Sequence, residues 1–203
     1  MPDAVKPRGP YAKSAKRREE ILASALTLFA DGGFESASLT AIAEAVGVSR
    51  EALRHYFSSR EELLLAVIEA RDARSVAMGA SAVDGTPLMT RVAESGETQR
   101  AERGLASLYA SMVATSVHSS DSTKAFFADR FTSLRADIES AIRTDQARGL
   151  IRSEVEASAL AALIVGAFEG LQQQWLVDER ISVADGIRLL DDLLKPHHGN
   201  LAH

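Results

Sequence analysis

The segment from Ser38 to Phe57 restricts the possible folds of this chain more than any other part of its sequence. Its first half places apolar residues at helical spacing, and Ala43 is small enough for a second helix to approach closely. Gly47 stands where the chain has to reverse within about three residues, and Ser49 can cap the helix that follows. The pattern predicts two short helices joined by a tight turn, with the amino end of the second helix facing outward.

The second of these helices carries side chains that suit contact with DNA. The amino end of such a helix can enter the major groove, where the helix dipole also favours nearby phosphate. Arg50 and Arg54 can reach guanine or phosphate oxygens. His55 and Tyr56 can contact bases or backbone, and Ala52 is small enough to meet a thymine methyl group. The alternative is that the segment only builds a small helical subdomain, with Tyr56 half in the core and His55 merely on the surface.

The formal net charge of −5 is divided unevenly along the chain. Residues 1–60 carry nine Lys/Arg and seven Asp/Glu, whereas the remainder carries 14 and 21. Many of the early cations precede the first acidic residues of the opening helix, and Lys16 and Arg17 are among them. We therefore predict a flexible basic arm over residues 1–13 that, together with these two cations, suits phosphate groups. Such an arm can equally be only a solvated terminus.

Helical signals dominate the sequence and strand signals are almost absent, so we predict an all-α fold. We expect breaks at residues 84–87 and 94–97. Three pairs have the spacing of capping boxes, in which each residue satisfies a backbone donor near the other: Ser59 and Glu62, Ser153 and Glu156, and Ser182 and Asp185. The expected helices span 14–31, 38–47, 49–57, 59–80, 99–117, 122–148, 153–177 and 182–194.

The predicted organisation consists of a small amino-terminal domain and a larger carboxyl-terminal one. The helix that starts at Arg60 belongs to both, so it can transmit a change from one to the other. The expected parts are a flexible basic arm (1–13), a three-helix helix-turn-helix DNA-binding domain (14–59), a helical dimerisation and effector-binding domain (60–195) and a flexible tail (196–203).

Residues 159–168 are apolar on every face of a helix, which a surface helix could not tolerate. We predict that one face packs within its own subunit and that the other, which is rich in small residues, meets the same helix of a second copy. The alternative is that both faces are covered within one chain. The residues expected at the dimer interface are Ala162, Gly166, Gly170, Leu189 and Leu193.

An aromatic set with a few polar groups in the carboxyl-terminal part has the composition of a small-molecule site. Ordinary core packing is the alternative for each member, and a surface position or a satisfied hydrogen bond is the alternative for the histidine. The candidate ligand contacts are Tyr109, Met112, His118, Phe127, Phe131, Phe168, Gln172 and Trp175.

From Arg17 to Asp72, roughly a quarter of the chain, the sequence resembles the TetR family of bacterial regulators. The resemblance rests on the Arg-x-x-Ile-Leu-x-x-Ala-x-x-Leu-Phe pattern that starts at Arg18, on Val46-Gly47-Val48-Ser49 and on His55-Tyr56-Phe57. It implies DNA contacts at Ser38, Ser49, Arg50, Ala52, His55, Tyr56 and Arg60, to which we add Lys16, Arg17, Thr40 and Arg54. Glu51 and Arg54 depart from the small and aromatic residues usual in the family, so the operator sequence is not predicted.

The resemblance also implies a function, which is repression of transcription by a cytoplasmic regulator. A two-fold dimer would present its recognition helices to half-sites roughly 34–36 Å apart, which predicts a palindromic operator in double-stranded DNA. An unidentified small-molecule effector would release the dimer by favouring a different separation of the two headpieces.

Two other classes of protein were considered, an enzyme and a helical adaptor that binds only another protein. The chain has no cysteine, no phosphate-binding glycine loop, no His-Glu-x-x-His pair and no nucleophile elbow. We therefore expect no catalysis, no cofactor and no metal. No apolar run reaches the roughly 18 residues of a membrane span, so no membrane partner is expected.

Overall fold

The computed structural model describes residues 10–30, 38–79, 85–119 and 121–196, and every regular element in these ranges is a helix. The all-α prediction is therefore confirmed for the described residues. The chain divides into two compact units, Met1–Ala77 and Met78–His203. No helix in the described ranges is both long enough and apolar enough to cross a membrane.

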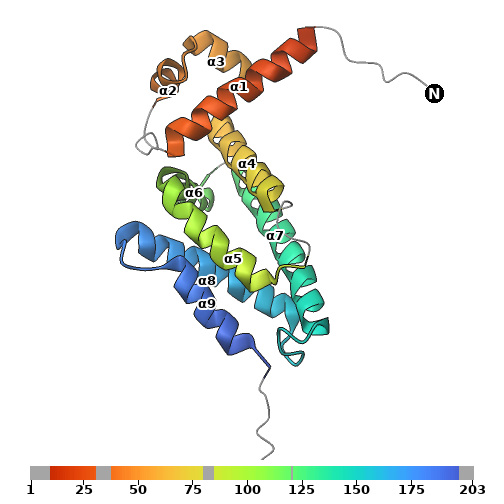
Figure 1. Ribbon diagram of the computed structural model, residues 1–203. Helices are drawn as coiled ribbons and strands as arrows, with labels where there is room; N and C mark the ends of the chain where they lie inside the picture. The colour runs from red at the N-terminus through yellow and green to blue at the C-terminus, as the bar shows by residue number, and fades with distance from the viewer. Residues whose placement is uncertain (1–9, 31–37, 80–84, 120, 197–203) are drawn as a thin grey trace, which may run out of the picture. The chain divides into compact units, whose positions relative to one another are not determined.

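The first unit consists of two short helices, α2 and α3, around the predicted turn and two long ones, α1 and α4 (Figure 1). The first helix begins at Pro10, inside the stretch predicted to be a flexible arm, because proline is well accommodated at the first position of a helix. Its predicted carboxyl end at residues 31–33 lies outside the described residues. The elements are α1 (Pro10–Ala30), α2 (Leu39–Ala45), α3 (Arg50–Tyr56) and α4 (Arg60–Gly79).

The turn between α2 and α3 has the conformation that its sequence predicts. Gly47 has φ +73, a left-handed conformation that glycine adopts without strain. The Val48 N–H donates to the Ala43 carbonyl at 2.9 Å, which closes the turn. Leu53 and Phe57 of the second helix are fully buried, so the short α3 is held by its apolar face.

The end of the first unit differs from the predicted division at residue 60. All but the last two residues of α4 fall within Met1–Ala77. Leu63, Leu64, Val67 and Ile68 along its first turns are buried. The chain division therefore falls inside a continuous helix.

The capping box predicted at the start of α4 forms only in part. The Glu62 N–H donates to Ser59 Oγ at 3.0 Å, as expected. The Glu62 carboxylate, however, accepts from the Ser58 N–H at 2.7 Å and from the Ser58 hydroxyl at 2.6 Å. It reaches one residue further back than predicted because Ser58 offers it two donors.

These bonds make the stability of the first unit depend on pH through Glu62. The hydroxyl and N–H of Ser58, and then the charge of Arg18, lower the pKa of this carboxyl from its ordinary value of 4.5. Since the pKa is depressed in the folded state, the stabilisation is present above pH about 4.5 and is lost as the pH falls through the folded-state pKa. We expect Glu62→Ala to reduce the free energy of unfolding by about 1 kcal/mol at neutral pH. In urea unfolding, this difference from wild type should shrink in acid, whereas a pH-independent difference, or an equal loss in Glu69→Ala, would contradict the assignment.

The second unit is a helical bundle in which α9 lies against α5 and α8 (Figure 1). Its core joins residues of all three helices with Ile142 of α7 and Ala106 of α6. The elements are α5 (Leu88–Thr98), a short 3-10 helix η1 (Gln99–Glu102), α6 (Arg103–Ser116), α7 (Asp121–Ala147), α8 (Ala157–Val177) and α9 (Val183–Leu194).

The break predicted at residues 94–97 is wrong, because α5 runs through it. Gly96, which lies inside this stretch, is needed for close packing. A Cβ atom there would lie 3.1 Å from Val183 Cγ1 and 3.2 Å from the backbone nitrogen of Ala184. The glycine therefore allows α9 to approach α5.

The predicted start of α8 at Ser153 is also wrong. The helix begins at Ala157 and its N-cap is Glu156, whose carboxylate accepts from the N–H groups of Ser158 at 3.0 Å and Ala159 at 2.7 Å. Glu156 thus acts as the cap itself and not as the distant partner of a serine cap. At α9 the predicted capping box also forms only in part. Ser182 Oγ accepts from the Asp185 N–H at 3.1 Å, whereas the Asp185 carboxylate pairs with Arg188 at 2.9 Å.

One buried carboxylate ties two helices of the second unit together. Asp145, only 3% exposed, accepts from the Leu88 N–H at 2.7 Å and from Arg148 at 3.0 Å. Leu88 is the first residue of α5, whose N-cap Pro87 supplies no side-chain hydrogen bond. Asp145 therefore caps α5 from α7.

We expect Asp145→Ala to lower the free energy of unfolding by about 2–3 kcal/mol, because it removes a charged hydrogen bond and leaves a buried N–H unsatisfied. Urea unfolding at fixed protein concentration measures the loss. Asp137→Ala, which removes an exposed carboxylate from the same helix, is the matched control. Equal small losses in the two variants would show that the cap contributes little.

Candidate nucleic-acid interface

The polar edge of α3 is exposed. Arg50, Arg54 and His55 are exposed, and Ala52 and Tyr56 are half-buried. Within the described residues neither Arg50 nor Arg54 has an ion-pair partner. The His55 and Tyr56 rings meet edge to face with centroids 5.1 Å apart. The helix therefore presents two available guanidinium groups and an aromatic pair on one short surface, above the buried Leu53 and Phe57.

The two serines predicted to contact DNA are the N-caps of the two helices. Ser38 Oγ accepts from the Ala41 N–H at 3.2 Å, and Ser49 Oγ accepts from the Ala52 N–H at 3.0 Å. Both serines are exposed, and each hydroxyl keeps its own hydrogen for donation. Capping a helix end and donating to a phosphate are therefore compatible.

The remaining predicted DNA contacts differ in how accessible they are. Lys16 and Thr40 are exposed. Arg17 is exposed and pairs with Glu20 at 2.8 Å, an interaction of small energy at the surface that phosphate can replace. Arg60 is half-buried in the first turn of α4.

Arg18 has a packing role that the sequence did not indicate. Its guanidinium lies 4.9 Å from the centre of the Phe57 ring and so joins α1 to the end of α3. Arg18 begins the Arg-x-x-Ile-Leu-x-x-Ala-x-x-Leu-Phe pattern of the first helix, which indicates that the residue matters to the fold. No local pattern, however, identifies an aromatic partner 39 residues away. Arg18 therefore helps to hold the short α3 rather than extending its polar edge.

The structure brings only some of the predicted ligand contacts together. Tyr109, Met112, Phe127, Gln172 and Trp175 are buried. Phe131 and Phe168 are half-buried, whereas His118 is exposed. The rings of Tyr109 and Phe127 meet edge to face, 6.1 Å between centroids.

Two polar side chains of this set, Tyr109 and Gln172, already have protein partners. The Tyr109 hydroxyl donates to Glu169 at 2.5 Å and accepts from Arg130 at 3.0 Å. Gln172 donates to the Ala106 carbonyl at 3.2 Å. Sequence reasoning missed Glu169 and Arg130, because a charged residue on a helix gives no sign of a tyrosine partner on another.

The residues predicted for dimerisation lie on the outer face of α8 and α9. Ala162 and Gly166 are exposed, and a Cβ atom at Gly166 or Gly170 would meet nothing within 4 Å. Leu189 and Leu193 are 62% and 59% exposed, and Leu163 beside Ala162 is 58% exposed. Leu160 and Ile164 on the opposite face of α8 are buried. Within the described residues, the outer apolar face is left uncovered by its own chain.

Comparison with known proteins shows that the first unit matches a known protein family. The sequence pattern of the family described as "Bacterial regulatory proteins, tetR family" matches residues 21–67, which include the whole α2–turn–α3 segment. The first unit therefore contains the amino-terminal domain of the TetR family of bacterial regulatory proteins. The family pattern therefore covers the buried face of α3 as well as its polar edge.

Two curated relatives each match less than a third of the chain. The repressor AcnR of Corynebacterium diphtheriae is 45% identical over 58 residues, which are 29% of this chain and 30% of AcnR. The activator FasR of Mycolicibacterium smegmatis is 39% identical over 62 residues, 30% of this chain and 28% of FasR. The match thus spans less than a third of the length of either relative.

The likeness in fold to solved structures extends over most of the chain. A transcriptional regulator from Saccharomonospora viridis, solved in complex with choline, superposes with a TM-score of 0.67 and 23% identity. The superposition covers 88% of this chain and 95% of that one. At this level of identity the likeness concerns the fold alone.

Proposed function

We propose that this TetR-family chain is a sequence-specific DNA-binding repressor of transcription. Its homodimer binds a palindromic operator through the two α3 helices, and a small-molecule effector releases it. The observation that carries the proposal is the exposed edge of α3, where Arg50 and Arg54 lack ion-pair partners among the described residues. Such guanidinium groups can bind guanine edges or phosphate.

The uncovered apolar face of α8 and α9 supports the homodimer. Leu163, Leu189 and Leu193 are large apolar side chains left mostly exposed, and Gly166 allows a second helix to approach closely. A two-fold pair would present two α3 helices to half-sites roughly 34–36 Å apart, which requires an operator with matching symmetry.

The small-molecule effector is supported by a solved relative and by the continuity of α4. The Saccharomonospora viridis regulator of similar fold was solved with choline bound. In this chain α4 runs without interruption from Arg60 past the boundary between the two units. A ligand that favours one state of the second unit can act on DNA affinity through such a helix, by its differential affinity for the two states.

Repression is proposed as the direction of control from the likeness to AcnR, although the likeness to the activator FasR is of similar strength. A reporter gene placed downstream of the selected operator distinguishes repression from activation. Repression requires that the protein lower expression, and higher expression would make it an activator with the same DNA-binding chemistry.

Selection of bound fragments from random and genomic DNA by the purified full-length chain tests the proposal. We expect one palindromic motif to be enriched, and the affinity for it to fall steeply with salt because phosphate contacts release counterions. A library of small molecules is then screened for compounds that release the protein from this motif. If no fragment is enriched over random sequence, the chain is not a specific regulator.

A further inference from the structure

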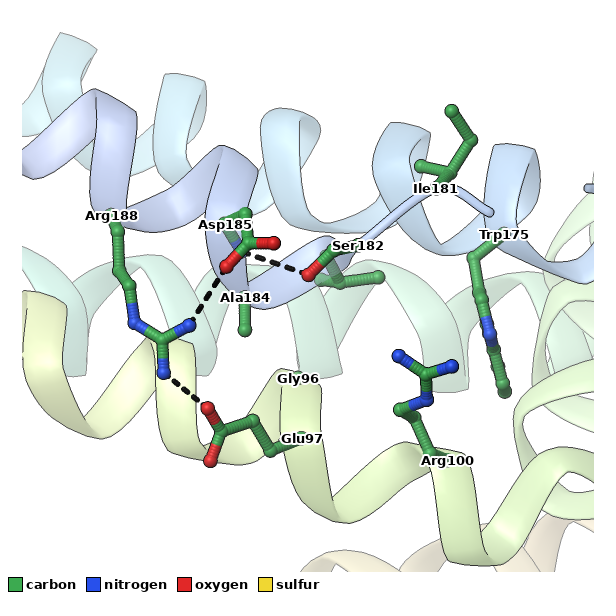
Figure 2. Close-up of a pocket in the computed structure, with 10 residues that line it drawn as sticks. Gly96, Glu97, Arg100, Trp175, Ile181, Ser182, Ala184, Asp185 and Arg188 are labelled. Atoms are coloured by element: carbon green, nitrogen blue, oxygen red, sulfur yellow. Dashed lines mark hydrogen bonds and ion pairs between the residues drawn. The ribbon is translucent and has the colours of Figure 1, made fainter. Parts of the chain in front are cut away.

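A hollow of about 210 Å³ lies where the end of α5, the end of α8 and the start of α9 meet (Figure 2). It is lined by the Arg100 guanidinium, the indole of Trp175, Ile181 and the first turn of α9. Its volume is below the roughly 300–1,000 Å³ of sites for drug-sized ligands, so only a small molecule fits.

The acidic groups of the hollow are already neutralised. Arg188 bridges Glu97 of α5 and Asp185 of α9, and Figure 2 draws both contacts. The Arg188–Asp185 contact is 2.9 Å long. A ligand cation would have to displace Arg188 from both carboxylates, which makes a cationic ligand unfavourable.

The remaining donors of the hollow have no protein acceptor. Arg100 is exposed and, within the described residues, has no ion-pair partner. Trp175 is 96% buried, since it is 4% exposed, and no acceptor among the described residues receives its indole N–H. This N–H is not among the enclosed side-chain atoms that lack a partner, so water or a ligand can reach it and accept its hydrogen.

We propose that this hollow binds a small organic carboxylate that carries a flat apolar group. The carboxylate accepts from Arg100 and from the indole N–H of Trp175. The apolar group packs on Ile181 and on the accessible edge of the Trp175 ring, because the Arg103 guanidinium already lies 5.3 Å from the centre of that ring. A charge-assisted hydrogen bond to a guanidinium is stronger than a neutral one, so the charge of the ligand contributes much of the affinity. The inference goes beyond the proposed function. Carboxylate binding in the hollow can be measured without DNA, so a failure of this inference and a failure of the DNA-binding proposal can be told apart.

Trp175 is the only tryptophan of the chain, so its indole N–H gives a single cross-peak in a ¹⁵N–¹H spectrum of the full-length protein. The probe is phenylacetate, which is titrated into the protein. Two control compounds are titrated in the same way: phenylacetamide has the same ring but no charge, and acetate has the charge but no ring. We expect phenylacetate to shift the indole peak in a saturable way. Phenylacetamide and acetate should each bind roughly tenfold more weakly or worse.

Arg100→Gln keeps most of the side-chain length and removes the charge, and we expect it to weaken phenylacetate binding by roughly tenfold or more. Arg91→Gln, which removes an exposed arginine of α5 outside the hollow, is the matched control and should bind as wild type does. The inference is overturned if phenylacetate causes no saturable shift, if phenylacetamide binds equally well, or if Arg100→Gln keeps wild-type affinity.

Discussion

Replacing Arg50 and Tyr56 together by alanine is expected to weaken binding to the selected operator by about a hundredfold or more. Each lost contact to a base or phosphate costs about 1–3 kcal/mol, and a dimer loses both contacts in both half-sites. Arg50 is exposed and has no ion pair among the described residues, so its removal leaves no buried charge behind. The loss should therefore appear in DNA affinity and not in folding.

Fluorescence anisotropy with the labelled operator measures the affinity at several salt concentrations. Because Arg50 is expected to neutralise phosphate or reach guanine, the double variant should also show a shallower dependence on salt. The control is Arg143→Ala, which removes a guanidinium that is 63% exposed on α7. Wild-type affinity in the double variant would exclude α3 as the recognition helix.

The α2–turn–α3 segment could be read from the sequence because each of its determinants is local. A capping serine acts within three residues, as Ser38 and Ser49 do here. The left-handed turn at Gly47 needs only the glycine itself. Burial of Leu53 follows from helical spacing. Local patterns were sufficient for the part that presents the candidate site.

Features that depend on distant contacts could not be predicted. A helix break was predicted at residues 94–97, but Gly96 in this stretch allows the approach of a helix that begins almost ninety residues later. Asp145 gave no sign that it would cap Leu88, 57 residues earlier. The hydrogen bonds of Tyr109 likewise join three helices. Sequence periodicity shows that a face is buried, but not which side chain of another helix meets it.

The second large effect is expected at the outer face of α8 and α9. We expect Leu189→Glu combined with Leu193→Glu to convert the proposed homodimer to a monomer, raising its dissociation constant by about a thousandfold or more. Two-fold symmetry would place four new carboxylates in one apolar interface, and an unpaired charge there costs several kcal/mol to desolvate. Both leucines are about 60% exposed in the single chain, so the monomer should keep its helical content.

Sedimentation velocity over a range of concentrations distinguishes dimer from monomer, and far-ultraviolet circular dichroism checks the fold. Val117→Glu places the same charge on an apolar residue that is 67% exposed at the end of α6, and it should leave the dimer intact. A monomer contacts one half-site at a time, so the double variant should also lose most of its affinity for a palindrome while keeping the surface of α3 unchanged. If the variant still sediments as a dimer, another surface must pair the subunits, and the spacing of half-sites would have to be derived from that surface.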